Sequence, residues 1–346
     1  MGADVCIRLR KKDLNMFSSR LFNLNKSVSE LLNNYPPRFG NAHKRKLYQI
    51  TMPLHKDDFA EINIVRTKFQ IREEKEIFKK NTVVIKYKPE FFNYISEKND
   101  LNKFVWHLNF ADENLFGFYG TDLFAQDEIQ VLEMPILACV REFLLSEDEY
   151  ENLGMAFEPY TNENQETPTP FLIKNVPYWL KLNTDFVSSD GKNISLYGNN
   201  FIHASWKEIQ EGISLIHEKV FNNIIAISAA KTSNGKYSKS EIEYALKAAA
   251  CAFEEAVKMS PKKTQTVIHT GNWGCGAFGG NKELMYLVQI IAASLAGVKE
   301  LVFHAITEAV LTKAKAKFMD MPEMTFADIV DFLYKQEFTW ESGDGN

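Results

Sequence analysis

Strand-like and helix-like patterns of apolar residues alternate along the second half of the chain. Short apolar runs typical of buried strands stand at residues 223–228, 266–269 and 301–306. Apolar residues at helical spacing occupy residues 238–253, 283–293 and 326–334, and Ser238 or Ser240 is the expected N-cap of the first helix. This alternation predicts an α/β fold, with a mainly parallel or mixed sheet flanked by helices and ligand-binding loops at the carboxyl ends of the strands.

The first hundred residues follow a different pattern. Helical spacing predicts a helix from Phe17 to Leu32, and a strand is expected at residues 82–87, between charge-rich stretches. We therefore expect residues 1–95 to form an accessory region packed on a main domain at residues 96–346. Within that domain, residues 158–195 are rich in Pro, Thr, Asn and Ser. This composition predicts a long surface excursion, either a partner-recognition insertion or a plain loop.

The segment Thr270–Gly280 is rich in glycine. It reads Thr-Gly-Asn-Trp-Gly-Cys-Gly-Ala-Phe-Gly-Gly and lies between the strand predicted at residues 266–269 and the helix predicted at residues 283–293. Five glycines in eleven residues let backbone amides approach a ligand closely, and the helix N-terminus behind them favours a phosphate group. Trp273 and Phe278 interrupt the glycines, which favours a shaped pocket over a turn that serves packing alone.

One candidate ligand for this loop is a dinucleotide. Gly274, Gly276 and Gly279 satisfy the G-x-G-x-x-G dinucleotide fingerprint. A nicotinamide site also needs an acidic residue at the end of the next strand, roughly 20 residues on. The strand expected at residues 301–306 has no acidic residue at its end, which argues against a dehydrogenase.

The whole eleven-residue string resembles the phosphate-binding loop of the poly(ADP-ribose) glycohydrolases, a branch of the macrodomains. A second segment, residues 109–129, can be laid without a gap on that family's pattern of an asparagine-containing stretch, three glycines and Gln-Glu-Glu. Gln126-Asp127-Glu128 falls on Gln-Glu-Glu, but Phe116-Gly117-Phe118 replaces the three glycines and Asp112 replaces an asparagine. The resemblance covers roughly residues 100–310 and implies a divergent macrodomain.

Carboxylic acids carry the chemistry that the resemblance implies. Hydrolysis of a ribosyl bond passes through an oxocarbenium-like state, and the leaving group needs a proton. An acid in an enclosed pocket can supply that proton and then activate water. Asp127 and Glu128 are neighbours at an expected helix start, where their side chains diverge by about 100°. The resemblance makes Glu128 the catalytic acid and gives Asp127 the task of holding the ribose.

The resemblance also implies a set of substrate-binding residues around the two acids. From the first segment it takes Asn109, Asp112, Gly117 and Gln126. From the glycine-rich loop it takes Thr270, Gly271, Asn272, Trp273, Gly274, Cys275, Gly276, Ala277 and Phe278. Phe278 is expected against the ribose and the diphosphate. Cys275 is expected to be structural because the reaction needs no thiol, and His107 and His269 are interpreted as packed strand residues.

The substrate linkage stays open. Asp112 joins Asp122, Asp127 and Glu128 in an acidic group that would attract the guanidinium of an ADP-ribosylated arginine. Removal of mono-ADP-ribose from protein, with arginine as one candidate acceptor, and cleavage of poly-ADP-ribose are therefore equal alternatives. A non-catalytic module that binds ADP-ribose as a reader is the rival hypothesis, although a reader has no need of an acid at position 128. No cofactor and no metal are expected, since no Cys/His spacing fits a zinc site.

Composition limits the partners and the compartment. A net charge of −5 argues against a general nucleic-acid binder, and the basic run His43–Lys46 is interpreted as a solvated turn. No apolar run reaches transmembrane length, so no membrane partner is expected. The cysteines lack paired spacing and predict free thiols; they are Cys6, Cys139, Cys251 and Cys275. We expect an ADP-ribosylated protein as substrate, ADP-ribose as product, and action in a cytosol, either the cell's own or, for a secreted effector, a host's.

Overall fold

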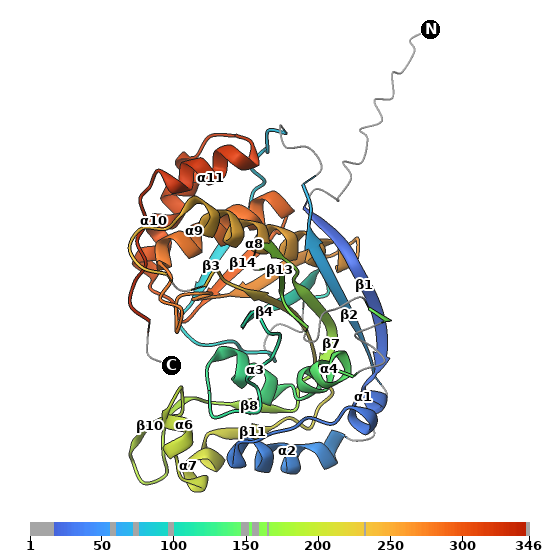
Figure 1. Ribbon diagram of the computed structural model, residues 1–346. Helices are drawn as coiled ribbons and strands as arrows, with labels where there is room; N and C mark the ends of the chain where they lie inside the picture. Colours follow the sequence, from blue (N-terminus) through green and yellow to red (C-terminus); the bar gives the residue numbers. More distant parts are fainter. Residues whose placement is uncertain are drawn as a thin grey trace.

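The computed structural model describes residues 17–55, 60–71, 76–95, 100–146, 152–153, 159–164, 166–231 and 233–343. Its centre is an eight-stranded mixed sheet (Figure 1). In spatial order the strands are β1 (Ser18–Ser27), β2 (Glu61–Phe69), β7 (Phe171–Pro177), β12 (Phe221–Ser228), β4 (Lys103–Ala111), β13 (Gln265–Thr270), β14 (Glu300–His304) and β3 (Val84–Lys88). The first four pair antiparallel with one another, and β12, β4, β13, β14 and β3 run parallel. This mixed α/β architecture confirms the predicted fold class.

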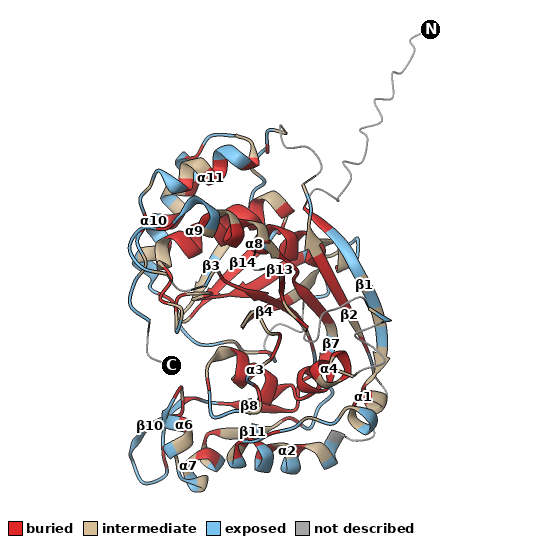
Figure 2. Cartoon of the chain, viewed as in Figure 1, coloured by how far each residue is buried: buried red, intermediate tan, exposed pale blue. Residues whose placement is uncertain are grey.

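Helices cover both faces of the sheet and bury two hydrophobic clusters against it (Figures 1 and 2). The first face carries α8 (Lys239–Met259), α9 (Lys282–Ala296), α10 (Glu308–Asp320) and α11 (Phe326–Tyr334). The second carries α1 (Val28–Asn34), α2 (Ala42–His55), α3 (Gln126–Glu133), α4 (Ile136–Leu144), α6 (Asn200–His203) and α7 (Trp206–Glu211). Within the described ranges no helix has the length and apolar character that a membrane span needs.

Short strand pairs complete the second face. They are β5 (Asn162–Glu163) with β6 (Thr167–Pro168), β8 (Leu180–Leu182) with β11 (Ile213–Leu215), and β9 (Asp185–Val187) with β10 (Asn193–Ser195). In Figure 1 the β8–β11 pair lies between α3 and α2. These strand pairs extend the layer that contains α3 on the second face of the sheet.

The elements of the second half follow the predicted pattern because local signals and packing agree there. Ser238 caps α8: its side chain accepts from the amide of Glu241, whose carboxylate accepts from the amide of Ser238 at 2.6 Å. The predicted apolar stripe of α8, from Ile242 to Phe253, is buried. Gly297, at φ +78°, ends α9 in the left-handed conformation that glycine adopts without strain.

The predicted helix from Phe17 to Leu32 is wrong, because residues 18–27 form β1 and only α1 follows. Phe22 and Leu24 are partly buried while Asn23 and Asn25 are exposed, which is the two-residue alternation of a strand. Pairing with β2 along the whole strand outweighs the helical spacing. The strand predicted at residues 82–87 is confirmed as β3.

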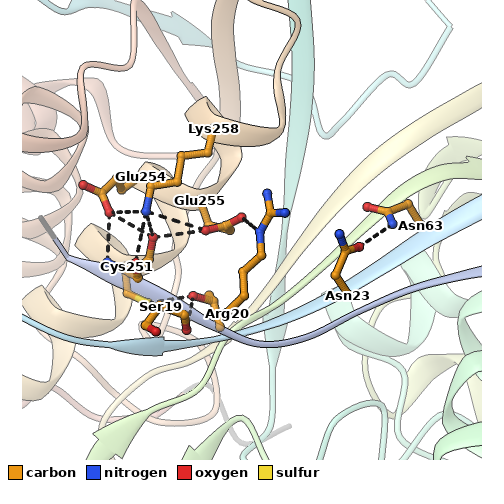
Figure 3. A network of polar contacts seen from close by, with 10 residues as sticks. Ser19, Arg20, Asn23, Asn63, Cys251, Glu254, Glu255 and Lys258 are labelled. Carbon is orange, nitrogen blue, oxygen red and sulfur yellow. Dashed lines mark hydrogen bonds and ion pairs between the residues drawn. The ribbon is translucent and has the colours of Figure 1, made fainter. Parts of the chain in front are cut away.

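A buried polar network fixes the start of β1 on α8 (Figure 3). One carboxylate oxygen of Glu254 accepts from the amides of Phe17 at 3.0 Å and Ser18 at 2.9 Å. Glu255 accepts from the guanidinium of Arg20 at 2.6 Å, and Lys258 lies 2.9 Å from Glu254. The network therefore joins the first described residues of the chain to α8, which packs on the sheet.

The predicted surface excursion at residues 158–195 is right only for its second part: residues 185–195, with β9 and β10, are mostly exposed, whereas residues 168–182 are largely buried. Residues 171–177 form β7, which lies inside the sheet between β2 and β12, and Phe171, Leu172 and Ile173 are fully buried. The prolines before this strand are typical of a loop by composition, but the strand itself is buried. Residues 158 and 165 lie outside the described ranges.

The expected accessory region contributes strands to the same sheet. β1 and β2 extend one side of the sheet, and β3 extends the other. The domain boundary at residue 95 stays a prediction.

Candidate active site

Gln126 joins the start of α3 to the neighbouring strand β4. Its side-chain oxygen accepts from the amide of Phe110 at 2.8 Å, and its nitrogen donates to the carbonyl of Leu108 at 3.1 Å. Both ends of the side-chain amide therefore bind the backbone of β4. This contact sets the position of the two acids that follow Gln126 in the helix.

Asp127 pairs with Asn109 of β4 inside the protein. The Asn109 Nδ2 donates to Asp127 Oδ1 at 2.9 Å, and both side chains are buried. Among the described residues, Asn109 Oδ1 and Asp127 Oδ2 have no hydrogen-bond partner. Burial raises the pKa of Asp127 well above its usual range, and the neighbouring Glu128 raises it further. Asp127 is thus a carboxyl that holds its proton more tightly than an exposed one.

Glu128 is buried beside Asp127 in the first turn of α3, as predicted. Its Oε2 accepts from the amide of Ala125 at 2.9 Å, so the side chain turns back over the helix N-terminus. The positive end of the helix dipole stabilises a negative charge at this position. The predicted catalytic role of Glu128 stays a prediction.

Lys44 of α2 is a residue of this site that the sequence argument missed. The basic run His43–Lys46 was expected to be a solvated turn, but it lies in a helix and Lys44 is fully buried. Lys44 Nζ donates to the carbonyls of Tyr119 at 3.1 Å and Leu123 at 2.5 Å. Burial lowers the pKa of Lys44 to about 8, and Glu128, Asp127 and Asp122 oppose that change. A buried lysine gives no local sequence signal.

The loop that replaces three glycines has one buried and one exposed phenylalanine. Phe116 adopts φ +52° and packs in the second cluster, whereas Phe118 is 39% exposed. The amide of Gly117 donates to the carbonyl of Asn114 at 2.7 Å. Of the two phenylalanines, only Phe118 can therefore narrow the space expected for the diphosphate.

Asp112 lies just after β4 and is half-buried. Its Oδ1 accepts from the amide of Asn114 at 3.0 Å, which turns the chain toward the Phe116 loop. Burial raises the pKa of Asp112. Asp112 also contributes to the raised pKa of Asp127, whereas Asp122 is exposed and accepts from Asn41 at 2.8 Å.

Side chains within the glycine-rich loop hold it between β13, β14 and α9. The Thr270 hydroxyl donates to the side-chain oxygen of Gln289 in α9. Asn272 donates to the carbonyl of Ala305 at 3.0 Å and accepts from the hydroxyl of Tyr286 at 2.5 Å. These contacts present the loop at the carboxyl end of β13, as predicted.

The tryptophan and cysteine side chains of the loop are buried inside the protein. Trp273 is fully buried and donates to the carbonyl of Ile227 at 3.1 Å. Cys275 is buried, and burial raises the pKa of its thiol, so it has no thiolate character near neutral pH. Phe278 is partly buried against the first cluster, and its expected contact with ribose stays a prediction. His107 and His269 are buried in β4 and β13 with ring centroids 4.8 Å apart, as interpreted from the sequence.

The glycines allow close approaches of backbone in this loop. Gly274 adopts φ +72° and Gly279 adopts φ +64°, both in the left-handed region. A Cβ on Gly271 would lie 2.9 Å from the carbonyl oxygen of His304. Asn281 then caps α9 by accepting from the amide of Leu284. The order of strand, tight loop and helix N-terminus is the arrangement that binds phosphate in other proteins.

The C-terminal tail crosses the same loop. The amide of Glu341 donates to the carbonyl of Gly279 at 2.7 Å. A Cβ on Gly279 would lie 2.4 Å from the carbonyl oxygen of Glu341, and one on Gly343 would lie 2.5 Å from that of Ala277. Trp340 stacks on Tyr237 with centroids 4.2 Å apart. No local sequence pattern predicted this contact.

Residues 192–313 match the model of a protein family described as Poly (ADP-ribose) glycohydrolase (PARG), Macro domain fold. This span contains β12, β13, β14 and the glycine-rich loop. Residues 192–313 are therefore similar to the macro domain of the poly(ADP-ribose) glycohydrolases. The matched span begins after α3, so it does not include Asp127 or Glu128.

Individual proteins also resemble this chain. Poly(ADP-ribose) glycohydrolase 1 of Caenorhabditis elegans is 42% identical over 59 residues, which are 17% of this chain and 7% of the worm protein. The similarity therefore spans a small part of that relative's length. A structure of the poly(ADP-ribose) glycohydrolase of Deinococcus radiodurans in complex with ADP-ribose is 14% identical, with a TM-score of 0.42 over 85% of this chain and 96% of that chain. The corresponding enzyme of Thermomonospora curvata is 12% identical, with a TM-score of 0.42 over 83% and 97%.

Proposed function

We propose that this protein hydrolyses the ribosyl bond of an ADP-ribosylated protein and releases ADP-ribose. The observation that carries this proposal is the buried pair of neighbouring carboxyls, Asp127 and Glu128, at the N-terminus of α3. The match of the glycine-rich loop to the poly(ADP-ribose) glycohydrolase family supports it. Glycoside hydrolases commonly use carboxyl groups to protonate the leaving group and to activate water.

Glu128 gives a proton to the atom that leaves the ribose anomeric carbon. The glycosidic bond then breaks with its electron pair on the leaving group, and the ribose ring takes up positive charge. The Glu128 carboxylate that remains accepts a proton from water as the water oxygen bonds to the anomeric carbon. The products are ADP-ribose and the freed acceptor, and Glu128 has regained its proton.

Asp127 and Asn109 bind the ribose in this proposal. Each has a buried polar atom without a partner among the described residues, and ribose hydroxyls can satisfy both. The protonated form that burial favours at Asp127 can donate a hydrogen bond, while Asn109 Oδ1 accepts one.

The glycine-rich loop binds the diphosphate. Its amides and the N-terminus of α9 supply donors and a positive dipole end, and small residues keep the backbone accessible. Thr270 to Ala277 take part through this backbone, because the Thr270, Asn272 and Trp273 side chains are bonded within the protein. Phe278 places its ring against the ribose and the diphosphate. Gly117 and Phe118 border the ligand on the side of α3.

The linkage that is cleaved is either mono-ADP-ribosyl, with arginine as a candidate acceptor, or ribose–ribose within poly-ADP-ribose. Three carboxyls act together at this end of the sheet, since Asp112 and Glu128 both raise the pKa of Asp127. Such a group attracts a guanidinium, which favours an arginine-linked substrate. Asp122 lies at the exposed edge of the same region.

Two measurements in sequence test the proposal. ADP-ribose, NAD and ATP are first compared for their effect on the melting temperature, because a ligand that binds only the folded state raises it with dose. Mono- and poly-ADP-ribosylated proteins are then assayed for release of ADP-ribose. Binding without release on either substrate would identify the rival function, a non-catalytic reader. No shift with ADP-ribose at millimolar concentration would contradict both functions.

A further inference from the structure

Lys44 is a buried cation whose neighbours come from the loop before α3. The side chain is fully buried, and its two hydrogen bonds end on the carbonyls of Tyr119 and Leu123. Burial of a lysine ammonium is unfavourable unless partners and opposite charge compensate it. The carbonyls supply partners, and the compensating charges are those of Glu128, Asp127 and Asp122.

The segment before Lys44 wraps around the same loop. The amides of Gly40 and Asn41 both donate to the carbonyl of Gly120 at 2.9 Å. The Asn41 side chain donates to Asp122 at 2.8 Å, and the Arg38 amide donates to the Tyr119 hydroxyl at 2.6 Å. Residues 38–44 and residues 119–123 therefore form one interlocked unit.

Close packing leaves this unit little room to shift. A Cβ on Gly120 would lie 2.6 Å from the carbonyl oxygen of Arg38. The loop continues directly into Ala125, whose amide donates to Glu128. The position of the acid pair is thus connected through a short, tightly held backbone to the ammonium of Lys44.

We propose that Lys44 is a positioning residue for the acid pair, because it holds the loop before α3 by two carbonyls and places a buried positive charge beside Asp127 and Glu128. The role rests on the proposed function and adds to it a residue of the N-terminal region, outside the span that matches the family. The charge opposes the burial that raises the pKa of Asp127, while the hydrogen bonds fix the geometry of the loop.

The charge of Lys44 depends on pH, whereas its hydrogen bonds to the loop do not require the charge. Burial lowers the pKa of Lys44 to about 8, so its charge is present at neutral pH and is lost in the alkaline range. The charged groups that act on Lys44 are Glu128, Asp127 and Asp122, and Asp112 acts on Asp127 as well. Removal of the positive charge takes away a contribution that lowers the pKa of Asp127, so Asp127 should lose its proton at higher pH.

Two variants separate charge from geometry. Lys44→Gln keeps a donor for the carbonyls and removes the charge, whereas Lys44→Arg keeps the charge. We expect Lys44→Gln to move the alkaline limb of kcat to higher pH by roughly one unit, because Asp127 then keeps its proton to higher pH, and Lys44→Arg to restore the position of that limb. Lys46→Met is the matched control, because Lys46 is exposed on the same helix, and its profile should equal that of the wild type.

Binding gives an independent measurement of the same shift. The dissociation constant of ADP-ribose is measured against pH for wild type and Lys44→Gln, with the melting temperature as a check on folding. If the wild type binds but releases no ADP-ribose from substrate, the proposed hydrolysis fails, and the binding profile alone decides the role of Lys44. A folded Lys44→Gln whose kcat and binding profiles coincide with those of the wild type would overturn it. If Lys44→Gln does not fold, Lys44→Arg decides: a wild-type alkaline limb supports the role of the charge, and a limb moved to higher pH contradicts it.

Discussion

Asn109 donates a 2.9 Å hydrogen bond to Asp127 across the contact between β4 and α3. The bond occupies one oxygen of the carboxyl and orients the other, which has no partner among the described residues. The Gln126 side chain binds the backbone of the same strand. Two adjacent contacts therefore hold Asp127 and Glu128 on β4. The geometry of the site therefore depends on the register of α3 against β4, and its variants can be chosen to leave that register intact.

Glu128→Gln should remove turnover and spare binding. Glutamine keeps the size of the side chain and an oxygen that accepts from the amide of Ala125, but it has no proton to give. We expect release of ADP-ribose to fall by about 10²-fold or more, with the ADP-ribose dissociation constant nearly unchanged. Single-turnover rates and calorimetric titrations measure the two quantities. Wild-type turnover of this variant on every substrate would contradict the proposed role of Glu128 as the catalytic acid.

Asp127→Asn should change stability in a pH-dependent way. A carboxyl with a raised pKa binds its proton more tightly when folded, so the wild type loses stability as pH rises above the ordinary value of 3.8 toward the folded pKa. Asparagine does not titrate and keeps an oxygen for Asn109. The free energy of unfolding of the variant minus that of the wild type should rise by about 1.4 kcal/mol per pH unit in that window.

Urea unfolding between about pH 4 and about pH 7 measures this difference. The variant should also bind ADP-ribose and turn over substrate less well, since Asp127 is expected to hold the ribose. A difference in unfolding free energy that stays constant with pH would show that Asp127 titrates normally.

The sequence predicted the half of the fold in which local pattern and packing agree. The capping box of Ser238 and Glu241 marks the start of α8, and the glycine-rich loop falls between β13 and α9 as expected. Asp127 and Glu128 lie in the first turn of a helix, also as expected. In these places a short stretch of residues carries the whole signal.

The parts that were missed depend on contacts between distant residues. β1 is a strand because it pairs with β2, although residues 17–32 also fit helical spacing. Lys44 is buried because its ammonium finds carbonyls more than seventy positions away, at Tyr119 and Leu123. The close approach of Glu341 to Gly279 likewise joins the end of the chain to the glycine-rich loop. No local pattern encodes such partners.

Asp112→Asn distinguishes the two substrate classes. The variant keeps the oxygen that accepts from the amide of Asn114, so the local turn should persist. If the Asp112 carboxylate binds a guanidinium, hydrolysis of arginine-linked ADP-ribose should fall by about 10-fold or more, because a charge-assisted hydrogen bond is lost. Cleavage of poly-ADP-ribose should be unchanged or faster. Equal rates of wild type and variant on the arginine-linked substrate would remove the arginine hypothesis.

Gly276→Val tests the glycine-rich loop as the diphosphate site. Gly276 is not among the glycines with positive φ, so a side chain there need not strain the backbone as it would at Gly274 or Gly279. Valine would place methyl groups where the backbone must approach phosphate. We expect the rise in melting temperature with ADP-ribose to disappear, while Glu128→Gln, the matched control outside the loop, keeps it. A folded Gly276→Val protein with the wild-type dose response would place the diphosphate elsewhere, and the loop would then serve packing beneath the C-terminal tail.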